Sequence, residues 1–352
     1  MQTALKKKPE FKIKSASRDI SLDAVKFFAI IGVLFIHSCN YFYPINSAAW
    51  TTNIFLSSVL RCAVPLFLMC SGVLLLNPKK QITFKALFTK YLLRLVIAMF
   101  FWAAFYKVLD LYFQNNLSYK SLVKAAKEVL KFDHKFHMYY MHIIIWVYVL
   151  LPVTKVLVNN MNKKELLYTL MVWFLTGIII STFISLNFLM PFEHIYNLYS
   201  VKMAYAAVGY CILGYFLKTY SQNNFFYTVC AAAGFLIIFS GTVLCSLKYN
   251  FLYTEFFNGF SLGVFLSAVG IFGILNNVKS FGIFNGLITY ISKASFCIYL
   301  VHVAFLNFTD FGLFLKFPQI IAVPSKVFIN LVLSTAVYFV ISKIPVAKKY
   351  II

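Results

Sequence analysis

The sequence has few charged residues for its length. Of its 352 residues, 12% are charged and 61% are hydrophobic, and the mean hydropathy is +0.81. A soluble globular domain has roughly 25% charged residues, so this composition excludes a soluble protein. A helix that crosses a membrane needs roughly 20 mostly apolar residues, and this chain has enough for about ten of them. Little sequence remains for a separate soluble domain or an extended tail.

Cysteine pairs, repeats and low-complexity tracts are also missing. The 7 cysteines stand singly in apolar runs, without a Cys-x-x-Cys pair or a histidine at metal-ligand spacing. We interpret them as small hydrophobic residues and expect no metal site and no bound cofactor. The net charge is +22. Such an excess is typical of cytoplasmic loops that face anionic lipid, so we expect membrane lipid and no nucleic acid as a partner.

Ten apolar runs predict an all-α, polytopic membrane protein with about ten transmembrane helices. The runs lie near 22–42, 54–76, 91–112, 138–158, 165–187, 199–218, 225–247, 256–276, 285–306 and 324–344. Lysine and arginine gather before the first run, in the second and fourth loops and after the last run, which predicts cytoplasmic N- and C-termini. We expect a basic cytoplasmic segment over 1–20, one transmembrane domain over 21–346 and a short cytoplasmic tail over 347–352. The first run is too long for a cleaved signal peptide.

The third loop departs from this charge pattern. It lies outside the cell on a ten-helix count, yet it carries Lys120, Lys124, Lys127, Lys131 and Lys135. Their spacing predicts an amphipathic helix. We interpret it as a solvated basic face, while contact with the outer membrane surface, contact with an anionic acceptor, and an error in the span count stay open.

Ionisable residues within the apolar runs indicate a candidate site, because each costs about 2.5–3.5 kcal/mol at the centre of an isolated helix. Lys26 and His37 are eleven residues apart and therefore share a helix face. Asp23 lies one turn before Lys26 and can neutralise it. Arg61, about two turns into the second run, is always charged and needs an acceptor or a water-filled site.

Other polar residues are expected at the same outer level. The ninth run carries a polar stripe formed by Ser292, Ser295, Tyr299 and His302. On the expected topology His37, Arg61, His137 and His302 all lie in the outer half of four different helices, which predicts a shared cavity. On the inner side Lys80, Lys85, Lys90 and Arg94 gather in the second loop and the start of the third run. This cluster fits a phosphate-rich ligand, or equally a topology signal with anionic lipid.

Several of these segments resemble one protein family. Lys26 followed after ten residues by His37 resembles the opening of the acyltransferase-3 family, whose mark is Arg or Lys, ten residues and then His. Val64-Pro65-Leu66-Phe67, followed by Ser71-Gly72, resembles its second helix, and the segments 137–152, 207–215 and 295–302 resemble its later helices in family order.

The resemblance implies a multi-pass protein of the bacterial inner membrane. Such a protein moves an acyl group, most often acetyl, from cytoplasmic acyl-CoA as co-substrate to a hydroxyl of a surface glycan or glycolipid. It implies that His37 is the essential histidine, with Lys26 as its basic partner and Asp23 beside it. Acyl-CoA binding is implied for Arg94, Lys90 and Lys85, although the family's Arg-x-x-Arg is here one residue longer, from Lys90 to Arg94.

Transfer to a hydroxyl needs a base and groups that stabilise the developing oxyanion, and histidine suits the base at neutral pH. We expect acceptor orientation or charge stabilisation from Arg61, His137, Tyr299, His302 and Ser71. Two other readings stay open, namely a transporter or flippase of lipid-linked sugars and a structural partner in a polysaccharide assembly. The acyl group, the acceptor and homo-oligomer formation stay open too.

Overall fold

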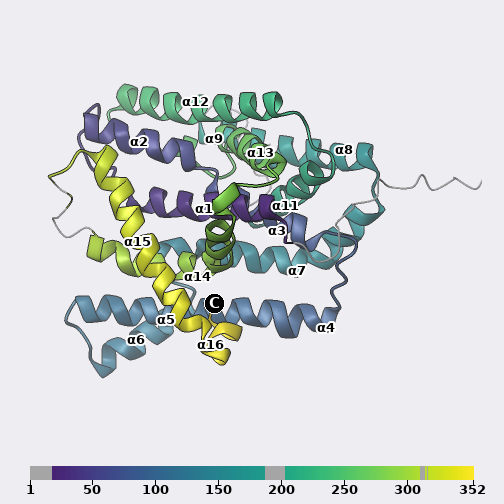
Figure 1. The fold of residues 1–352 in the computed structure, drawn as a ribbon. Coiled ribbons are helices and arrows are strands. Elements are labelled where there is room, and N and C mark those ends of the chain that lie inside the picture. Colours follow the sequence, from purple (N-terminus) through teal and green to yellow (C-terminus); the bar gives the residue numbers. More distant parts are fainter. Residues whose placement is uncertain (1–17, 187–202, 310–313, 315) are drawn as a thin grey trace, which may run out of the picture.

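The chain folds into a bundle of helices (Figure 1). The computed structural model describes residues 18–186, 203–309, 314 and 316–352. Within these residues it contains no strand, and nine of its helices are long and apolar enough to cross a membrane. This confirms the prediction of an all-α, polytopic membrane protein.

The helices follow the expected apolar runs in order. They are α1 (Ile20–Ser38), α2 (Ala48–Leu60), α3 (Ala63–Leu75), α4 (Phe84–Ala86), α5 (Leu93–Phe113), α6 (Tyr119–Leu130), α7 (Tyr139–Asn160), α8 (Lys163–Trp173), α9 (Ile180–Ser185), α11 (Met203–Thr219), α12 (Asn224–Tyr249), α13 (Leu262–Asn277), α14 (Asn285–Thr309), α15 (Gln319–Ser342) and α16 (Pro345–Tyr350). Two π-helical turns, η1 (Leu87–Leu92) and η3 (Phe174–Ile179), join α4 to α5 and α8 to α9. The beginning of the expected run 199–218 lies outside the described residues.

The expected run 54–76 is divided into two helices. Pro65 has no backbone N–H, so it cannot donate the helical hydrogen bond to the carbonyl of Arg61. The helix is interrupted here, since α2 ends at Leu60 and α3 begins at Ala63. Arg61 therefore lies at a helix break and not inside a continuous helix. By contrast, the helix predicted in the third loop is present as α6.

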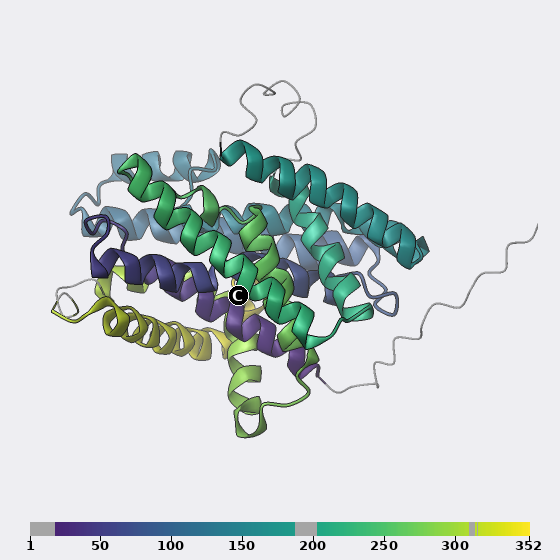
Figure 2. The same cartoon turned by 90° about the horizontal axis from the view of Figure 1, so that it is seen from above.

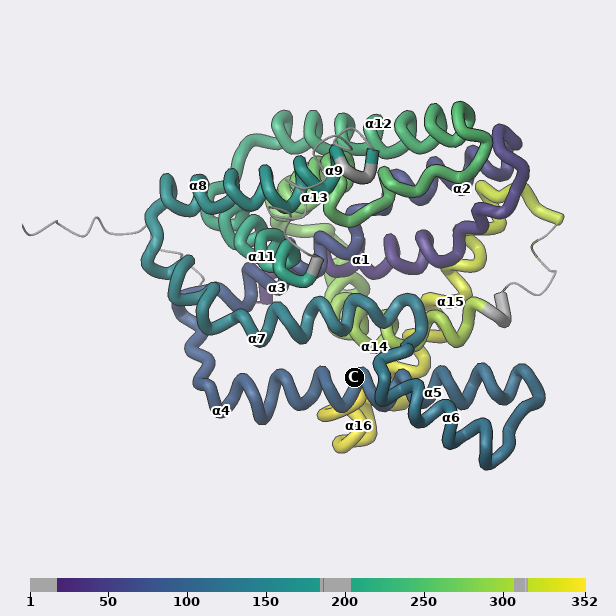
Figure 3. Tube along the Cα trace, turned by 180° about the vertical axis from the view of Figure 1, so that it is seen from behind, coloured from purple at the N-terminus to yellow at the C-terminus, as the bar shows by residue number. Residues whose placement is uncertain are grey.

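The middle of the bundle depends on close contact between α3 and α11. A Cβ atom added at Gly72 would lie 1.9 Å from the carbonyl oxygen of Cys211, and one at Gly214 would lie 2.3 Å from that of Met69. The two backbones therefore touch where these glycines stand. Viewed from above, α12 crosses the face of the bundle diagonally (Figure 2), and from behind α7 lies between α1 and α5 (Figure 3).

Candidate functional site

Two histidines from distant parts of the chain meet between α1 and α14. Nδ1 of His37 lies 2.6 Å from Nε2 of His302. The ring centroids are 4.9 Å apart and the ring planes are 8° from parallel. Because the two nitrogens are much closer together than the centroids, the rings face each other edge to edge. We call these two residues the histidine pair.

Hydrogen bonding determines where the protons of the neutral histidine pair lie. Nδ1 of His302 lies 2.7 Å from the carbonyl oxygen of Tyr299, and a carbonyl can only accept, so this nitrogen carries the proton. Nε2 of His302 must then accept from Nδ1 of His37. This assignment leaves Nε2 of His37 as an unprotonated nitrogen, which is what a general base requires.

His137 is buried beside the histidine pair. Its ring centroid lies 5.3 Å from that of His302 and 5.7 Å from that of Tyr299. The hydroxyl of Tyr299 donates to the carbonyl oxygen of His137 over 2.6 Å, and so fixes the start of α7 against α14. The structure thus brings His37, His137 and His302 together, as expected from their level in the membrane.

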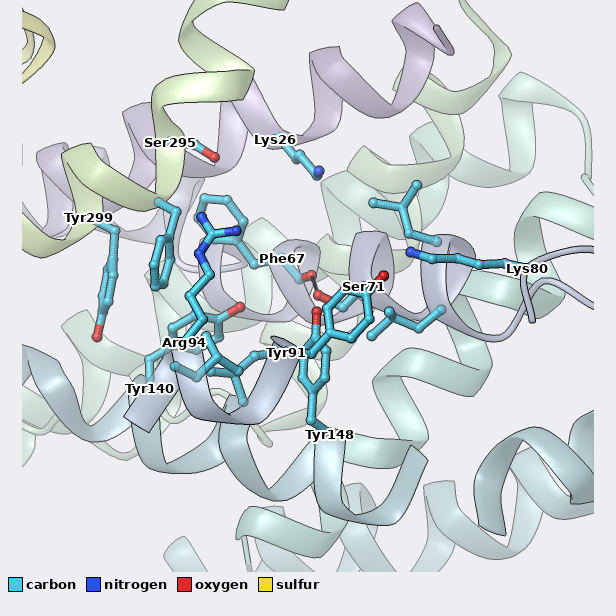
Figure 4. A pocket seen from close by; sticks show the side chains of 15 residues that line it. Lys26, Phe67, Ser71, Lys80, Tyr91, Arg94, Tyr140, Tyr148, Ser295 and Tyr299 are labelled. Atoms are coloured by element: carbon cyan, nitrogen blue, oxygen red, sulfur yellow. Dashed lines mark hydrogen bonds between the residues drawn. The ribbon is translucent and has the colours of Figure 1, made fainter. Parts of the chain in front are cut away.

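A cavity of about 300 Å³ lies beside this cluster (Figure 4). Its polar lining residues are Lys26, Ser71, Lys80, Tyr91, Arg94, Tyr140, Tyr148, Ser295 and Tyr299. We call it the Arg94 cavity. Lys26, Lys80 and Arg94 reach into it from three sides, while Tyr299 brings it to within one helical turn of His302 along α14.

The Arg94 cavity is strongly positive. Three cationic side chains line it, and no lining residue is acidic among those that the structure describes. Burial lowers the pKa of Lys80, and the charges of Lys155, Lys26 and Lys90 lower it further. Repulsion among unneutralised cations of this kind is relieved by an anion, and phosphate oxygens accept hydrogen bonds from Lys and Arg.

Asp23 does not neutralise Lys26 as the sequence indicated. Its carboxylate accepts two hydrogen bonds from Arg18, at 2.5 and 2.7 Å, and a third from Ser292 at 2.6 Å. The guanidinium fork matches a carboxylate better than a single ammonium does, and this explains the choice of partner. Asp23 thereby links α1 to α14. The Lys26 side chain, which Asp23 does not neutralise, lines the Arg94 cavity.

The three basic residues expected to bind acyl-CoA have different surroundings. Arg94 lines the cavity and also donates to a main-chain oxygen of Ile352. Lys85 and Lys90 are exposed and do not line it. The cavity is lined instead by Lys80, which belongs to the basic cluster in the sequence but was given no site role there. Lys80 lies in the loop that follows α3. Ser71 lies in this cavity too, and its hydroxyl donates to the carbonyl of Phe67 over 2.9 Å.

Arg61 lines a second cavity of about 360 Å³, which we call the Arg61 cavity. Its polar lining residues are Arg61, Tyr139, Tyr210, Thr254, Glu255 and Asn258. The two cavities share no lining residue, but both follow α3 and α7, because Leu68 and Tyr139 line this one while Ser71 and Tyr140 line the other. Glu255 was not selected from the sequence, since it is a single acidic residue just before an apolar run.

Comparison with known proteins identifies a family for this chain. A family model described as an acyltransferase domain matches residues 19–343, nearly the whole chain. No curated protein and no solved structure gave a match. The matched region contains the histidine pair and both cavities. The chain therefore belongs to the acyltransferase-3 family and is a membrane acyltransferase.

Proposed function

We propose that the protein is an O-acyltransferase of the bacterial inner membrane. It moves an acetyl or similar acyl group from cytoplasmic acyl-CoA to a hydroxyl of a surface glycan or glycolipid outside. The observation that carries this proposal is the histidine pair, in which Nε2 of His37 is left unprotonated, together with a cationic cavity that extends to Tyr299, one helical turn from His302. The excess of lysine and arginine at both ends of the chain supports the orientation.

The donor fits the Arg94 cavity by charge. Lys26, Lys80 and Arg94 supply three cations, and the phosphate groups of acyl-CoA supply matching anions. With the phosphates near Lys80 and Lys26, the pantetheine arm runs past Arg94 toward Tyr299, which lies on the opposite side of the cavity from Lys80 (Figure 4). The thioester then arrives close to the histidine pair, while the acyl-CoA itself is a co-substrate and leaves as CoA.

Transfer requires one proton to move twice. Nε2 of His37 takes the proton of the acceptor hydroxyl as its oxygen attacks the thioester carbonyl. The carbon–oxygen bond forms and the carbon–sulfur bond breaks, and the same proton passes to the leaving thiolate, which gives CoA. His302 accepts the hydrogen bond from Nδ1 of His37 throughout and stabilises the imidazolium. Brief acylation of His37 would use the same lone pair.

The test uses purified protein in liposomes loaded with radiolabelled acetyl-CoA, with glycan acceptors outside. Wild type should release CoA and label the outside acceptor, and His37→Ala should do neither. His142→Ala is the control, because His142 stacks on His134 and not on the histidine pair. Full activity of His37→Ala would overturn the role of His37. A folded wild type that consumes no CoA with any acceptor would favour a transporter instead.

A further inference from the structure

The Arg61 cavity has a lining of balanced charge. Arg61 and Glu255 are the charged residues that line it in the described part of the chain, so their formal charges cancel. The Arg94 cavity, in contrast, holds cations alone. A ligand with a net charge would meet an opposing side chain in the Arg61 cavity whichever sign it had, and this favours a neutral ligand.

The lining also offers hydrogen-bond donors and acceptors together. The guanidinium of Arg61 only donates, the carboxylate of Glu255 only accepts, and the side chains of Tyr139, Thr254 and Asn258 do both. A hydroxyl group likewise donates one hydrogen bond and accepts others. Several hydroxyl groups on one ligand therefore match this mixture better than a phosphate or carboxylate does, because those groups only accept.

The guanidinium of Arg61 is held in one orientation. Its Nε donates to the carbonyl oxygen of Phe257 over 2.7 Å, and its Cζ lies 4.7 Å from the centroid of the Phe257 ring. The hydrogen bond uses the Nε edge of the guanidinium, and the ring contact uses one of its faces. Among the residues that the structure describes, the two Nη groups at its far end have no hydrogen-bond partner, so they can bind a ligand in the cavity as a fork of fixed geometry.

Aromatic rings make up much of the remaining wall. Tyr139, Tyr210, Phe257 and Phe260 all line the cavity, and the hydroxyl of Tyr210 donates to the carbonyl oxygen of Gly259 over 2.7 Å, which holds the 254–260 segment in place. Flat apolar surfaces of this kind pack against the C–H faces of a ring. With a volume of about 360 Å³, the cavity falls within the usual range of small-ligand sites.

The Arg61 cavity lies next to the histidine pair. The ring of Phe257 lies 5.9 Å from that of Tyr41, four residues after His37. Tyr139 follows His137 by two residues.

We propose that the Arg61 cavity is the acceptor site and selects a neutral sugar ring, whose hydroxyl groups are held by Arg61 and Glu255 and whose C–H faces pack on the aromatic wall. This inference rests on the proposed function, since it assigns the acceptor of that reaction to a second cavity. On this proposal the opposite charges of Arg61 and Glu255 together give the cavity its preference for a neutral sugar.

The test measures binding by saturation-transfer NMR on the full chain in lipid nanodiscs, because maltoside detergents would compete. The probes are methyl α-glucopyranoside, which is neutral, and the corresponding methyl glucuronoside, which is anionic. Wild type should prefer the neutral probe. Glu255→Gln leaves the cavity positive and should move the preference toward the glucuronoside by roughly tenfold, while Arg61→Gln should move it the other way.

Glu165→Gln is the matched control, because Glu165 caps α8 outside both cavities and glutamine can serve the same cap. Arg61→Met, which also removes the charge, replaces Arg61→Gln if the latter does not fold. An unchanged preference in the Glu255 and Arg61 variants, or an equal shift in Glu165→Gln, would overturn the proposal. Binding needs no acyl-CoA, so altered preference without CoA release would overturn the proposed function and leave the sugar site standing.

Discussion

Nδ1 of His37 and Nε2 of His302 lie 2.6 Å apart, although 265 residues separate them in the chain. Contacts within α14 and from α15 hold His302 in place. Tyr299 accepts from the far side of the His302 ring, and Asn330 on α15 donates to the carbonyl oxygen of His302 over 3.0 Å. We therefore propose that His302 is a positioning residue, which fixes the tautomer and the direction of His37.

Replacement of His302 should affect the chemical step more than substrate binding. In His302→Ala, Nδ1 of His37 loses its acceptor, so we expect kcat to fall roughly 100-fold with little change in KM. His302→Gln should recover part of the loss, because its side-chain oxygen can accept the same hydrogen bond. Steady-state kinetics of CoA release check this prediction. An equal loss in both variants, or a loss confined to KM, would contradict it.

Arg94 and Lys85 provide a matched pair of basic residues, one inside the Arg94 cavity and one outside it. Arg94→Gln should raise the KM for acyl-CoA by roughly tenfold, because a hydrogen bond to a charged group is worth about 1.5–3 kcal/mol. Lys85→Gln should change it little. Titration of acyl-CoA against initial rates distinguishes the two. Similar effects from both substitutions would indicate that surface charge, and not the cavity, attracts the donor.

Binding of the donor should weaken at alkaline pH. Burial, followed by the charges of Lys155, Lys26 and Lys90, holds the pKa of Lys80 below 10.5. Phosphates attract only the protonated form, so affinity is full below this lowered pKa and declines as the pH rises through it. Calorimetry with a thioether analogue of acetyl-CoA, which resists alkaline hydrolysis, measures the decline. Lys80→Arg should show a smaller decline over this range, because the guanidinium stays charged, and a decline as large as that of wild type would contradict the assignment.

Gly72→Ala should destabilise the fold. The added methyl group would lie 1.9 Å from the carbonyl oxygen of Cys211, so α3 and α11 would have to separate. We expect a loss of about 1–3 kcal/mol, as for other overpacked cores. Gly286→Ala on α14 is the control, because its methyl group would meet nothing within 4 Å. Thermal unfolding in nanodiscs compares the two variants with wild type, and equal midpoints would refute the close contact.

The helices could be predicted from the sequence because the bilayer requires long apolar runs. The cost of burying polar groups likewise pointed to His37, His137 and His302 individually. Their pairing depends on how α1 packs against α14, which no local pattern records. For the same reason the sequence assigned Asp23 to its near neighbour Lys26, while the structure pairs it with Arg18.

The basic cluster could be predicted as a cluster but not in its details. Lys80, Lys85 and Lys90 have equal standing in the sequence, and only the path of the chain after α3 decides which of them faces the cavity. Glu255 could not be selected from the sequence. Its proposed role depends on its sharing a cavity with Arg61, which lies 194 residues earlier in the chain. The break at Arg61 could have been read from Pro65, whose effect on the preceding carbonyl is local.

The π-helical turn η1 (Leu87–Leu92) lies where the spacing from Lys90 to Arg94 is one residue longer than in the family pattern. A π-helical turn closes its hydrogen bonds from i to i+5 and so accommodates one residue more than an α-helical turn. The additional residue thus widens one turn of the helix. It does not lengthen the helix along its axis, so the segments on either side keep the same depth in the bilayer. The π-helical turn thus takes up the longer spacing within the segment just before Arg94, which lies on the cavity wall.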